Sequence, residues 1–469
     1  MSILKTLSVE TKVKSTTSRC QFCNEMVPAE VVRVIQNGAN QVVMRKTCEQ
    51  HGFSETVISS DAHFYWHAEG NPVNRDAGTN GGCGSGCACS VGGGRDGFLG
   101  ENALNEAKKG TIDKLSTCLA LIEIVDSCNL SCPTCFADSP LGIGTKLKCH
   151  SFEDITSRIA LNLGKKGHID IIQFSGGEPT LHPDLFRLVE WVCSNEQIDC
   201  LLINTNGVRL AKDMTFVEEM GRLYKKFDNI QFYLQFDGPQ EAGQVEIRGV
   251  DLRNVRERAI ENCGLVNLPI TFAMTVDATN FGHIWDTIDY ARKYDHVRGV
   301  SFQPMFLSGR TTIGVKLPPP ITVAHIINGL NDQSKGILLT DDFTPVPCGD
   351  PNCLVIGWLV RMGETFYSPS KFGINVAELQ KLMPDKVNYD IEDLKKCGCD
   401  NTVLGEMMKQ HAMRESNAFQ IFIKPFMDGR TWDEDRVDRC CTHVIRPDGK
   451  LDSFCRYYNQ QMQKNSTIR

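Results

Sequence analysis

Three closely spaced cysteines give this sequence its clearest chemical signal. Cys128, Cys132 and Cys135 lie in the segment IEIVDSCNLSCPTCFAD, directly after an apolar run. A 4Fe–4S cluster takes four ligands, so three thiolates leave one iron open to a small molecule. The spacing predicts such an open cluster. A zinc site and chance coincidence are the competing interpretations of the spacing taken alone.

A glycine-rich turn supplies the second part of this signal. The segment FSGGEPT ends the next apolar run and contains Gly176, Gly177 and Glu178. Two glycines allow the backbone to approach a ligand closely, and the glutamate offers a carboxylate to an ammonium group. By itself the motif would indicate only a turn. Here it ends the strand that follows the cysteine motif, so the two motifs together favour one binding site.

Both motifs lie in a region where short β-branched or aromatic runs alternate with helix-length amphipathic segments. Six β/α units predict an α/β fold, a mostly parallel sheet closed into a partial (β/α)6 barrel, with function at the carboxyl ends of its strands. The predicted strands are residues 119–125, 169–174, 199–203, 230–236, 270–276 and 298–303.

The N-terminal region contains two short pairs of metal-binding residue types. Cys20 and Cys23 form one pair, and Cys48 and His51 form the other, with a β-rich stretch between them. Four nitrogen and sulfur ligands in paired spacings predict a closed tetrahedral site for one zinc or iron ion, as in a rubredoxin-like or zinc-ribbon domain. A surface role for His51 would leave this site incomplete.

The remaining clustered cysteines suggest two auxiliary clusters. The chain has 21 cysteines, and a cytoplasmic protein keeps its thiols reduced, which favours metal sites over disulfides. Adjacent cysteines rarely both ligate one cluster, so either Cys440 or Cys441 is the spare one in the second set. The first set is Cys83, Cys87, Cys89 and Cys118; the second is Cys348, Cys353, Cys441 and Cys455, with Cys440 as the alternative ligand.

The amino-acid composition limits the classes of partner that we expect this protein to bind. The net charge of −7 lacks the basic excess of a nucleic-acid-binding protein. No apolar run is long enough to span a bilayer, and the first residues lack the apolar core of a signal peptide. We therefore expect a cytoplasmic protein that binds no nucleic acid and has no transmembrane segment, and whose contact with the inner face of a membrane would be peripheral.

The cysteine groups and a proline-rich break divide the chain into four predicted parts. Residues 1–70 form the rubredoxin-like metal-binding domain, and residues 71–118 form a Gly/Cys-rich auxiliary-cluster segment. Residues 119–320 form the partial barrel, and residues 321–469 form a C-terminal auxiliary iron–sulfur domain.

CNLSCPTCF followed by SGGEPT resembles the radical S-adenosylmethionine (radical SAM) superfamily over about residues 119–303. The resemblance implies that S-adenosylmethionine chelates the open iron and, after electron transfer from a reductant such as ferredoxin or flavodoxin, yields a 5'-deoxyadenosyl radical. It also implies a binding pocket for S-adenosylmethionine, although each polar residue at a strand end could instead belong to a solvated turn. The residues implied in this pocket are Phe136, Gly176, Gly177, Glu178, Asn204, Asn206, Gln235, Asp237 and Gln303.

Longer segments, including CQFCNEMVPA, KTCEQHGFSETVISSD, SFQPMFLSGR and RCCTHVIRPDGKLDSFCRYYN, resemble the tetraether lipid synthase family, formerly described as pterin methylase-like proteins. This resemblance implies one radical SAM cluster, two auxiliary 4Fe–4S clusters and a mononuclear iron. It further implies an enzyme that removes hydrogen from two lipid chains and joins the resulting carbons.

Two other hypotheses compete with lipid coupling. One is a different radical SAM reaction, such as methylation of a pterin or modification of a nucleotide or peptide. The other is a multi-cluster iron–sulfur electron carrier without catalytic activity. Cleavage of S-adenosylmethionine distinguishes a radical SAM enzyme from an electron carrier. A carrier would not cleave it, because clusters with four cysteine ligands offer no open iron.

Overall fold

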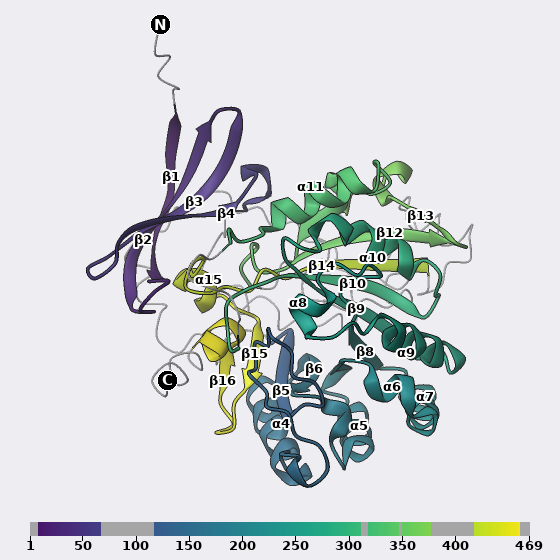
Figure 1. Cartoon of the computed structure of the whole chain (residues 1–469). Helices are drawn as coiled ribbons and strands as arrows, with labels where there is room; N and C mark the ends of the chain where they lie inside the picture. Colours follow the sequence, from purple (N-terminus) through teal and green to yellow (C-terminus); the bar gives the residue numbers. More distant parts are fainter. Residues whose placement is uncertain (1–7, 67–116, 311–317, 347–348, 377–416, 460–469) are drawn as a thin grey trace, which may run out of the picture.

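Two β-sheets organise this chain (Figure 1). The computed structural model describes residues 8–66, 117–310, 318–346, 349–376 and 417–459. Within these ranges, a four-stranded sheet forms the N-terminal region, and a mixed sheet of twelve strands contains the barrel and its extensions.

The N-terminal sheet is an antiparallel meander. Alternate residues of its second strand, such as Val27, Ala29 and Val31, are buried, as expected when one face of a sheet packs inward. The turn after the first strand and the turn after the third carry the two predicted ligand pairs. The strands are β1 (Val9–Arg19), β2 (Met26–Gln36), β3 (Ala39–Cys48) and β4 (Gly52–Ser59).

Six parallel strands in sequential order form the barrel, and the predicted fold class is confirmed. Each predicted strand lies within two residues of an observed one. Nearly continuous burial along these strands explains their apolar, β-branched sequences. The strands are β5 (Leu119–Val125), β6 (Ile169–Gly176), β7 (Ile198–Thr205), β8 (Ile230–Gln235), β9 (Ile270–Val276) and β10 (Val297–Pro304).

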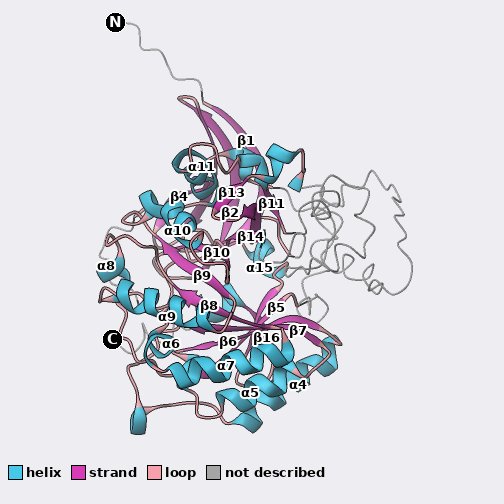
Figure 2. Cartoon of the chain, turned by 90° about the vertical axis from the view of Figure 1, so that its right-hand side faces the viewer, coloured by secondary structure: helices cyan, strands magenta, loops and turns pink. Residues whose placement is uncertain are grey.

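Helices cover the outer face of the barrel, as the two views show (Figures 1 and 2). The first, α4, begins at an N-cap formed by Ser151 and buries Ile155, Ile159 and Leu163 against the sheet, which confirms the helical spacing in the sequence. The helices of this part are α4 (Phe152–Lys166), α5 (Leu185–Cys193), α6 (Val208–Lys212), α7 (Met214–Phe227), α8 (Gln244–Arg248), α9 (Arg253–Leu265) and α10 (Ile284–Ala291).

Residues after the barrel extend its sheet at both edges. Strand β14 (Ala418–Ile423) pairs in parallel with β10, and β15 (Thr442–Ile445) pairs in parallel with β5. A domain boundary near residue 320 stays a prediction, since strands from both sides of it share one sheet. The other elements are β11 (Phe343–Pro345), β12 (Val355–Met362), β13 (Thr365–Tyr367), β16 (Leu451–Ser453), α11 (Val323–Gln333) and α15 (Glu434–Asp438), with short 3-10 helices at Ala62–Phe64, Gly144–Lys146, Pro179–Leu181, Phe281–His283, Thr340–Asp342 and Pro369–Phe372.

The N-terminal sheet docks on the C-terminal residues, with β1 beside α15 (Figure 1). The buried Lys46 ammonium donates to the carbonyl oxygen of Arg430 at 3.0 Å, and the Ser18 hydroxyl donates to that of Trp432 at 2.6 Å. Each of these side chains pairs with a backbone oxygen that would otherwise be buried without a partner, so the two regions pack in one defined orientation.

Across the described ranges, the helices are too short or too polar to traverse a lipid bilayer.

The buried His296 makes stability depend on pH. Its Nε2 lies 2.9 Å from the carbonyl oxygen of Ile260. Burial, opposed by this hydrogen bond, lowers the pKa of His296 from 6.5 to about 4. Between these values the unfolded chain binds more protons than the folded one, so the free energy of unfolding falls by up to about 1.4 kcal/mol per pH unit as the pH drops.

We expect His296→Gln to flatten this dependence between pH 6.5 and pH 4, measured by urea denaturation across that interval. Leu265→Gln, at an exposed residue of α9 that carries no titratable group, is the control and should keep the slope of the parent protein. Equal slopes for the His296→Gln variant and the parent would contradict the prediction.

Candidate active site

A cavity of about 170 Å³ opens at the carboxyl ends of the barrel strands. Its wall takes residues from the ends of β6 to β10 and from the loop after β5. Parallel strands end at one edge of the sheet, so segments far apart in sequence meet here. The polar and sulfur-bearing lining comprises Cys128, Cys132, Thr134, Cys135, Gln173, Ser175, Glu178, Asn204, Thr205, Asn206, Tyr233, Gln235, Arg248, Thr275, Gln303, Lys424 and Thr442.

The three cysteines lie on one loop, and hydrogen bonds fix the backbone at each of them. Cys128 donates its N–H to the carbonyl oxygen of Pro140 at 2.9 Å, and Cys135 exchanges two backbone hydrogen bonds of 2.9 Å with Arg310. The Arg310 guanidinium also donates to the carbonyl oxygen of Cys132 at 2.8 Å. Sequence reasoning missed this role of Arg310, because no local spacing connects it to the cysteines.

The donor set of this loop fits a polynuclear cluster. Among the described residues, the sulfur atoms of Cys128, Cys132 and Cys135 are not gathered within 4.8 Å of one another, as ligands of a single ion would be. Burial and the nearby Glu178 carboxylate raise the pKa of Cys128 to about 12. A bound metal would reverse this effect, since a coordinating thiol is deprotonated outright.

The two glycines of the SGGE turn press directly against the start of the cysteine loop. Gly176 has a φ of +109°, and the Gly177 N–H donates to the carbonyl oxygen of Val125 at 2.6 Å. A Cβ on Gly177 would lie 2.0 Å from the carbonyl oxygen of Ser127, and one on Gly176 would lie 2.1 Å from that of Val125. Only glycine permits this approach, so the two sequence motifs form one structural unit.

Glu178 holds the ends of β6 and β7 together. Its carboxylate accepts hydrogen bonds from the hydroxyls of Thr180 at 2.6 Å and Thr205 at 2.7 Å, and from the N–H of Asn206 at 2.8 Å. Burial raises its pKa, although these hydrogen bonds oppose the effect. Glu178 also lines the cavity. Its contact with the ammonium group of a ligand stays a prediction.

The other polar residues predicted for the pocket form separate hydrogen bonds along the strand ends. Asn206 donates to Asn129 at 2.7 Å and lies 3.8 Å from the Cys128 sulfur. Asn204 donates to the Ser175 hydroxyl at 3.0 Å, and Gln303 donates to the Tyr233 hydroxyl at 2.8 Å. These interactions fix the side-chain orientations before any ligand binds.

Asp237 occupies a different position from its predicted partners. It is absent from the cavity wall and nearly fully buried, where it forms ion pairs with Arg248 at 2.7 Å and Arg256 at 3.1 Å. Burial would raise the pKa of Asp237, but the two guanidinium groups lower it to about 2. Asp237 therefore orients Arg248, and Arg248 lines the cavity. No spacing in the sequence indicated Arg248.

One wall of the cavity is aromatic and aliphatic. The Phe136 ring lies 5.6 Å from Phe454 and 4.8 Å from Tyr458, and Phe426 stacks on Phe454 at 4.0 Å. Phe136, Phe426 and Phe454 line the cavity together with Phe306. Sequence reasoning identified Phe136 alone, because Phe426 and Phe454 lie 290 and 318 positions further along the chain.

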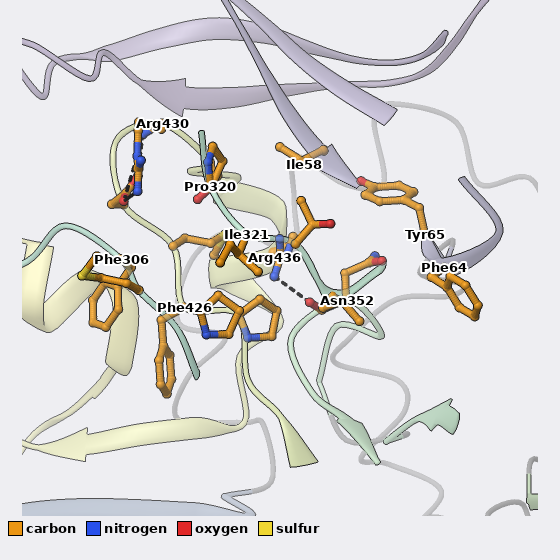
Figure 3. A pocket seen from close by; sticks show the side chains of 18 residues that line it. Ile58, Phe64, Tyr65, Phe306, Pro320, Ile321, Asn352, Phe426, Arg430 and Arg436 are labelled. Carbon is orange, nitrogen blue, oxygen red and sulfur yellow. Dashed lines mark hydrogen bonds and ion pairs between the residues drawn. The ribbon is translucent and has the colours of Figure 1, made fainter. Parts of the chain in front are cut away.

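A second cavity of about 40 Å³ adjoins the aromatic wall (Figure 3). Both cavities share Pro304, Met305, Phe306 and Phe426. Beyond these residues the second cavity is lined by Ile58, Phe64 and Tyr65 of the N-terminal region, by residues 320–323, and by C-terminal residues that include Asn352, Arg430 and Arg436. Three parts of the chain therefore meet at an extension of the site whose wall contains both apolar and charged side chains.

The four ligand atoms of the N-terminal region converge. The atoms of Cys20, Cys23, Cys48 and His51 all lie within 4.8 Å of one another. The Cys23 and Cys48 sulfurs are 3.8 Å apart, and His51 Nδ1 is 3.5 Å from the Cys48 sulfur. These separations fit four ligands around one ion, with Nδ1 as the histidine donor.

The predicted auxiliary sites lie partly outside the described residues, namely at Cys83, Cys87, Cys89 and Cys348. Of the rest, Cys440, Cys441 and Cys455 are buried, and Arg436 lies 3.6 Å from the Cys353 sulfur. The Cys440 thiol donates to the carbonyl oxygen of Thr442 at 3.1 Å. Pairing of β5 with β15 brings Cys118 next to Cys441. The ligand sets of both auxiliary clusters stay predictions.

Comparisons with known proteins agree with this geometry. Residues 122–291 match the radical SAM superfamily, and residues 13–60 match the HMPTM N-terminal zinc ribbon domain. The chain is a radical SAM enzyme with an N-terminal zinc ribbon. Radical SAM enzymes use S-adenosylmethionine, a 4Fe–4S cluster and a reductant, and a zinc ribbon binds a mononuclear metal.

Individual relatives differ in how much of the chain they cover. The chain is 28% identical over 513 aligned residues to 7,8-dihydro-6-hydroxymethylpterin dimethyltransferase of Methanocaldococcus jannaschii, which covers 97% of this chain and 96% of that protein. It is 29% identical over 188 residues to GTP 3',8-cyclase of Syntrophomonas wolfei, covering 39% and 55%. Among solved structures, Streptococcus suis SuiB bound to S-adenosylmethionine aligns with a TM-score of 0.37 and 17% identity over 50% of each chain.

The contact between the glycine turn and the cysteine loop leads to a direct test. We expect Gly177→Ala to abolish binding of the cluster, because the new Cβ must displace the backbone of Ser127 next to Cys128. Iron and sulfide analysis after anaerobic reconstitution, with the visible absorption spectrum, measures the loss.

Gly164→Ala is the matched control, since Gly164 lies in α4 and nothing lies within 4 Å of its added Cβ. It should keep full cluster content and gain slightly in stability, by about 0.5–1 kcal/mol. Normal cluster content in a folded Gly177→Ala variant would show that the close backbone contact is dispensable.

Proposed function

We propose that this enzyme uses a 5'-deoxyadenosyl radical to remove hydrogen from unactivated carbons of lipid chains and to join those carbons, as in tetraether lipid synthesis. Cys128, Cys132 and Cys135 would hold the radical SAM cluster. The observation that carries the lipid assignment is the aromatic wall of the main cavity, which continues through Phe306 and Phe426 into the second cavity.

When bound, S-adenosylmethionine and its cluster supply a radical that abstracts a hydrogen atom from the substrate. The residues of this chain bind and orient. Gly176 and Gly177 keep the cysteine loop against β6, and Glu178 faces the place where the methionyl amine would lie. Asn204, Asn206, Gln235 and Gln303 offer hydrogen bonds to the rest of the nucleotide.

The wall of the main cavity contains side chains of two kinds. The cysteines and the amide side chains offer metal ligands and hydrogen bonds, whereas Phe306, Phe426 and Phe454 offer apolar surface. Apolar side chains exclude water from the reacting carbon and bind a hydrocarbon without specific hydrogen bonds. Cavities of this kind suit an alkyl chain whose polar headgroup stays at a distance from the reaction.

The proposal also includes three metal centres outside the barrel: one mononuclear ion and two auxiliary clusters. Cys20, Cys23, Cys48 and His51 would hold one iron or zinc ion. The two cysteine sets that include Cys118 and Cys353 would hold auxiliary 4Fe–4S clusters. The position of the zinc ribbon beside the second cavity, through Ile58, supports a structural role in shaping the substrate site.

Anaerobic incubation of the reconstituted, reduced enzyme with S-adenosylmethionine tests the proposal, with and without a membrane lipid extract. We expect lipid to raise 5'-deoxyadenosine release and to give a coupled product. Each new carbon–carbon bond removes two hydrogen atoms, so two 5'-deoxyadenosine molecules should form per bond. Mass spectrometry measures both compounds.

Release that is indifferent to lipid would refute lipid as the substrate and leave the radical SAM assignment in place. No release from a protein that holds the cluster at Cys128, Cys132 and Cys135 would refute catalysis and favour an electron carrier.

The second cavity gives a more local prediction. Ile321→Phe places a larger side chain in its wall and should lower lipid-stimulated release at least several-fold, because an alkyl chain no longer fits. Leu265→Phe, at a residue that is 74% exposed on α9, is the matched control and should behave as the parent enzyme. Equal lipid stimulation in both variants would contradict a role for this cavity.

Pterin methylation is the second candidate function. It is favoured by the similarity along 97% of the chain to a protein named 7,8-dihydro-6-hydroxymethylpterin dimethyltransferase. The same assay discriminates when this pterin replaces the lipid extract: methylation adds carbon to the pterin, whereas lipid coupling leaves the pterin unchanged.

A further inference from the structure

Arg248, the last residue of α8, faces the cysteine loop. It lines the main cavity together with Cys132. The neighbouring Gly249 packs so closely on this loop that an added Cβ would lie 3.2 Å from Pro133 Cδ and 3.6 Å from the carbonyl oxygen of Ser131. The end of α8 is therefore in contact with the residues on either side of Cys132.

Three hydrogen bonds fix the Arg248 guanidinium. Its Nε donates to Asp237 Oδ2 at 2.7 Å, and its Nη2 donates to Asp237 Oδ1 at 3.0 Å and to the Thr275 hydroxyl at 3.0 Å. Asp237 is itself held by the N–H of Thr275 at 3.0 Å. A planar guanidinium bound in this two-pronged way keeps one orientation, which a lysine ammonium could not reproduce.

The charges around Asp237 do not cancel among themselves. Arg256 forms a second ion pair with the same carboxylate and turns its other nitrogen to the carbonyl oxygen of Phe236 and the side chain of Gln244. Two buried cations thus share one carboxylate, which leaves one positive charge to balance. An unbalanced buried charge is costly, so a nearby anion should complete the group.

The Cys132 sulfur is in place to be that anion. Burial would lower the pKa of Arg248, but the Asp237 carboxylate and then the negative charge of a Cys132 thiolate outweigh burial and raise it. Hydrogen bonds to the ligating sulfurs are one of the means by which proteins set the reduction potential of iron–sulfur clusters.

We propose that Arg248, oriented by Asp237, holds its positive charge beside the Cys132 thiolate and thereby raises the reduction potential of the cluster at Cys128, Cys132 and Cys135. Reduction adds a negative charge to the cluster, so a fixed cation at a ligating sulfur stabilises the reduced form more than the oxidised form. The inference rests on the proposed assignment of this cluster. Its consequence is that an external reductant can deliver the electron more easily.

Redox titration of the full-length reconstituted protein, followed by electron paramagnetic resonance without S-adenosylmethionine, tests this role. We expect Arg248→Gln to shift the midpoint potential to a more negative value, by roughly tenfold in the reduction equilibrium, which is about 59 mV for one electron. Arg248→Lys retains the charge and should lie between Arg248→Gln and the parent protein.

Arg253→Gln is the matched control, because Arg253 lies nearby on α9 and pairs with the surface residue Asp251. The midpoint potential of this variant should equal that of the parent protein.

Should Arg248→Gln lose the cluster, the shift measured for Arg248→Lys still decides the matter. An unchanged potential in cluster-bearing Arg248 variants would overturn the inference, even if their affinity for S-adenosylmethionine fell. A parent protein that holds no cluster would overturn the proposed function as well.

Discussion

The contact between Gly176–Gly177 and the backbone of residues 125–127 is the constraint on which the site depends. It brings the end of β6 within van der Waals distance of the loop that carries Cys128, Cys132 and Cys135. Any side chain at either glycine would separate the loop from the sheet. The geometry of the cysteines is therefore set by two strands of the barrel core, where burial leaves little room for movement.

Buried charge forms the second layer of organisation. Glu178 joins β6 to β7 through Thr205 and Asn206, and Asp237 joins β8 to α8 and α9 through two arginines. Both carboxylates are held in place by protein donors. The polar side of the cavity is accordingly rigid before a ligand enters, which suits an enzyme that must direct a reactive radical at one carbon.

The apolar side of the cavity has a different origin. Strands β14 and β15 add C-terminal residues to both edges of the barrel sheet, and the residues around them bring Phe426 and Phe454 against Phe136. The zinc ribbon then closes the second cavity from outside through Ile58, Phe64 and Tyr65. Under the proposed function, substrate selection would depend on segments outside the barrel, whereas binding of S-adenosylmethionine would depend on the barrel itself.

The sequence by itself determined the class of enzyme, the six-stranded barrel and the ribbon, and it identified four candidate metal ligands that the fold brings together. Apolar periodicity and short cysteine spacings are local properties, which survive in any conformation of the chain. It also identified most polar residues at the strand ends, because the carboxyl ends of parallel strands must meet. Only the tertiary structure assigned Asp237 to a buried ion pair and brought Arg248 and Arg310 to the cysteine loop. It also joined Phe136 to Phe454 and placed the two cavities side by side. These contacts connect residues 100 or more positions apart in most cases, and their energies arise from burial and charge pairing that exist only after the chain has folded.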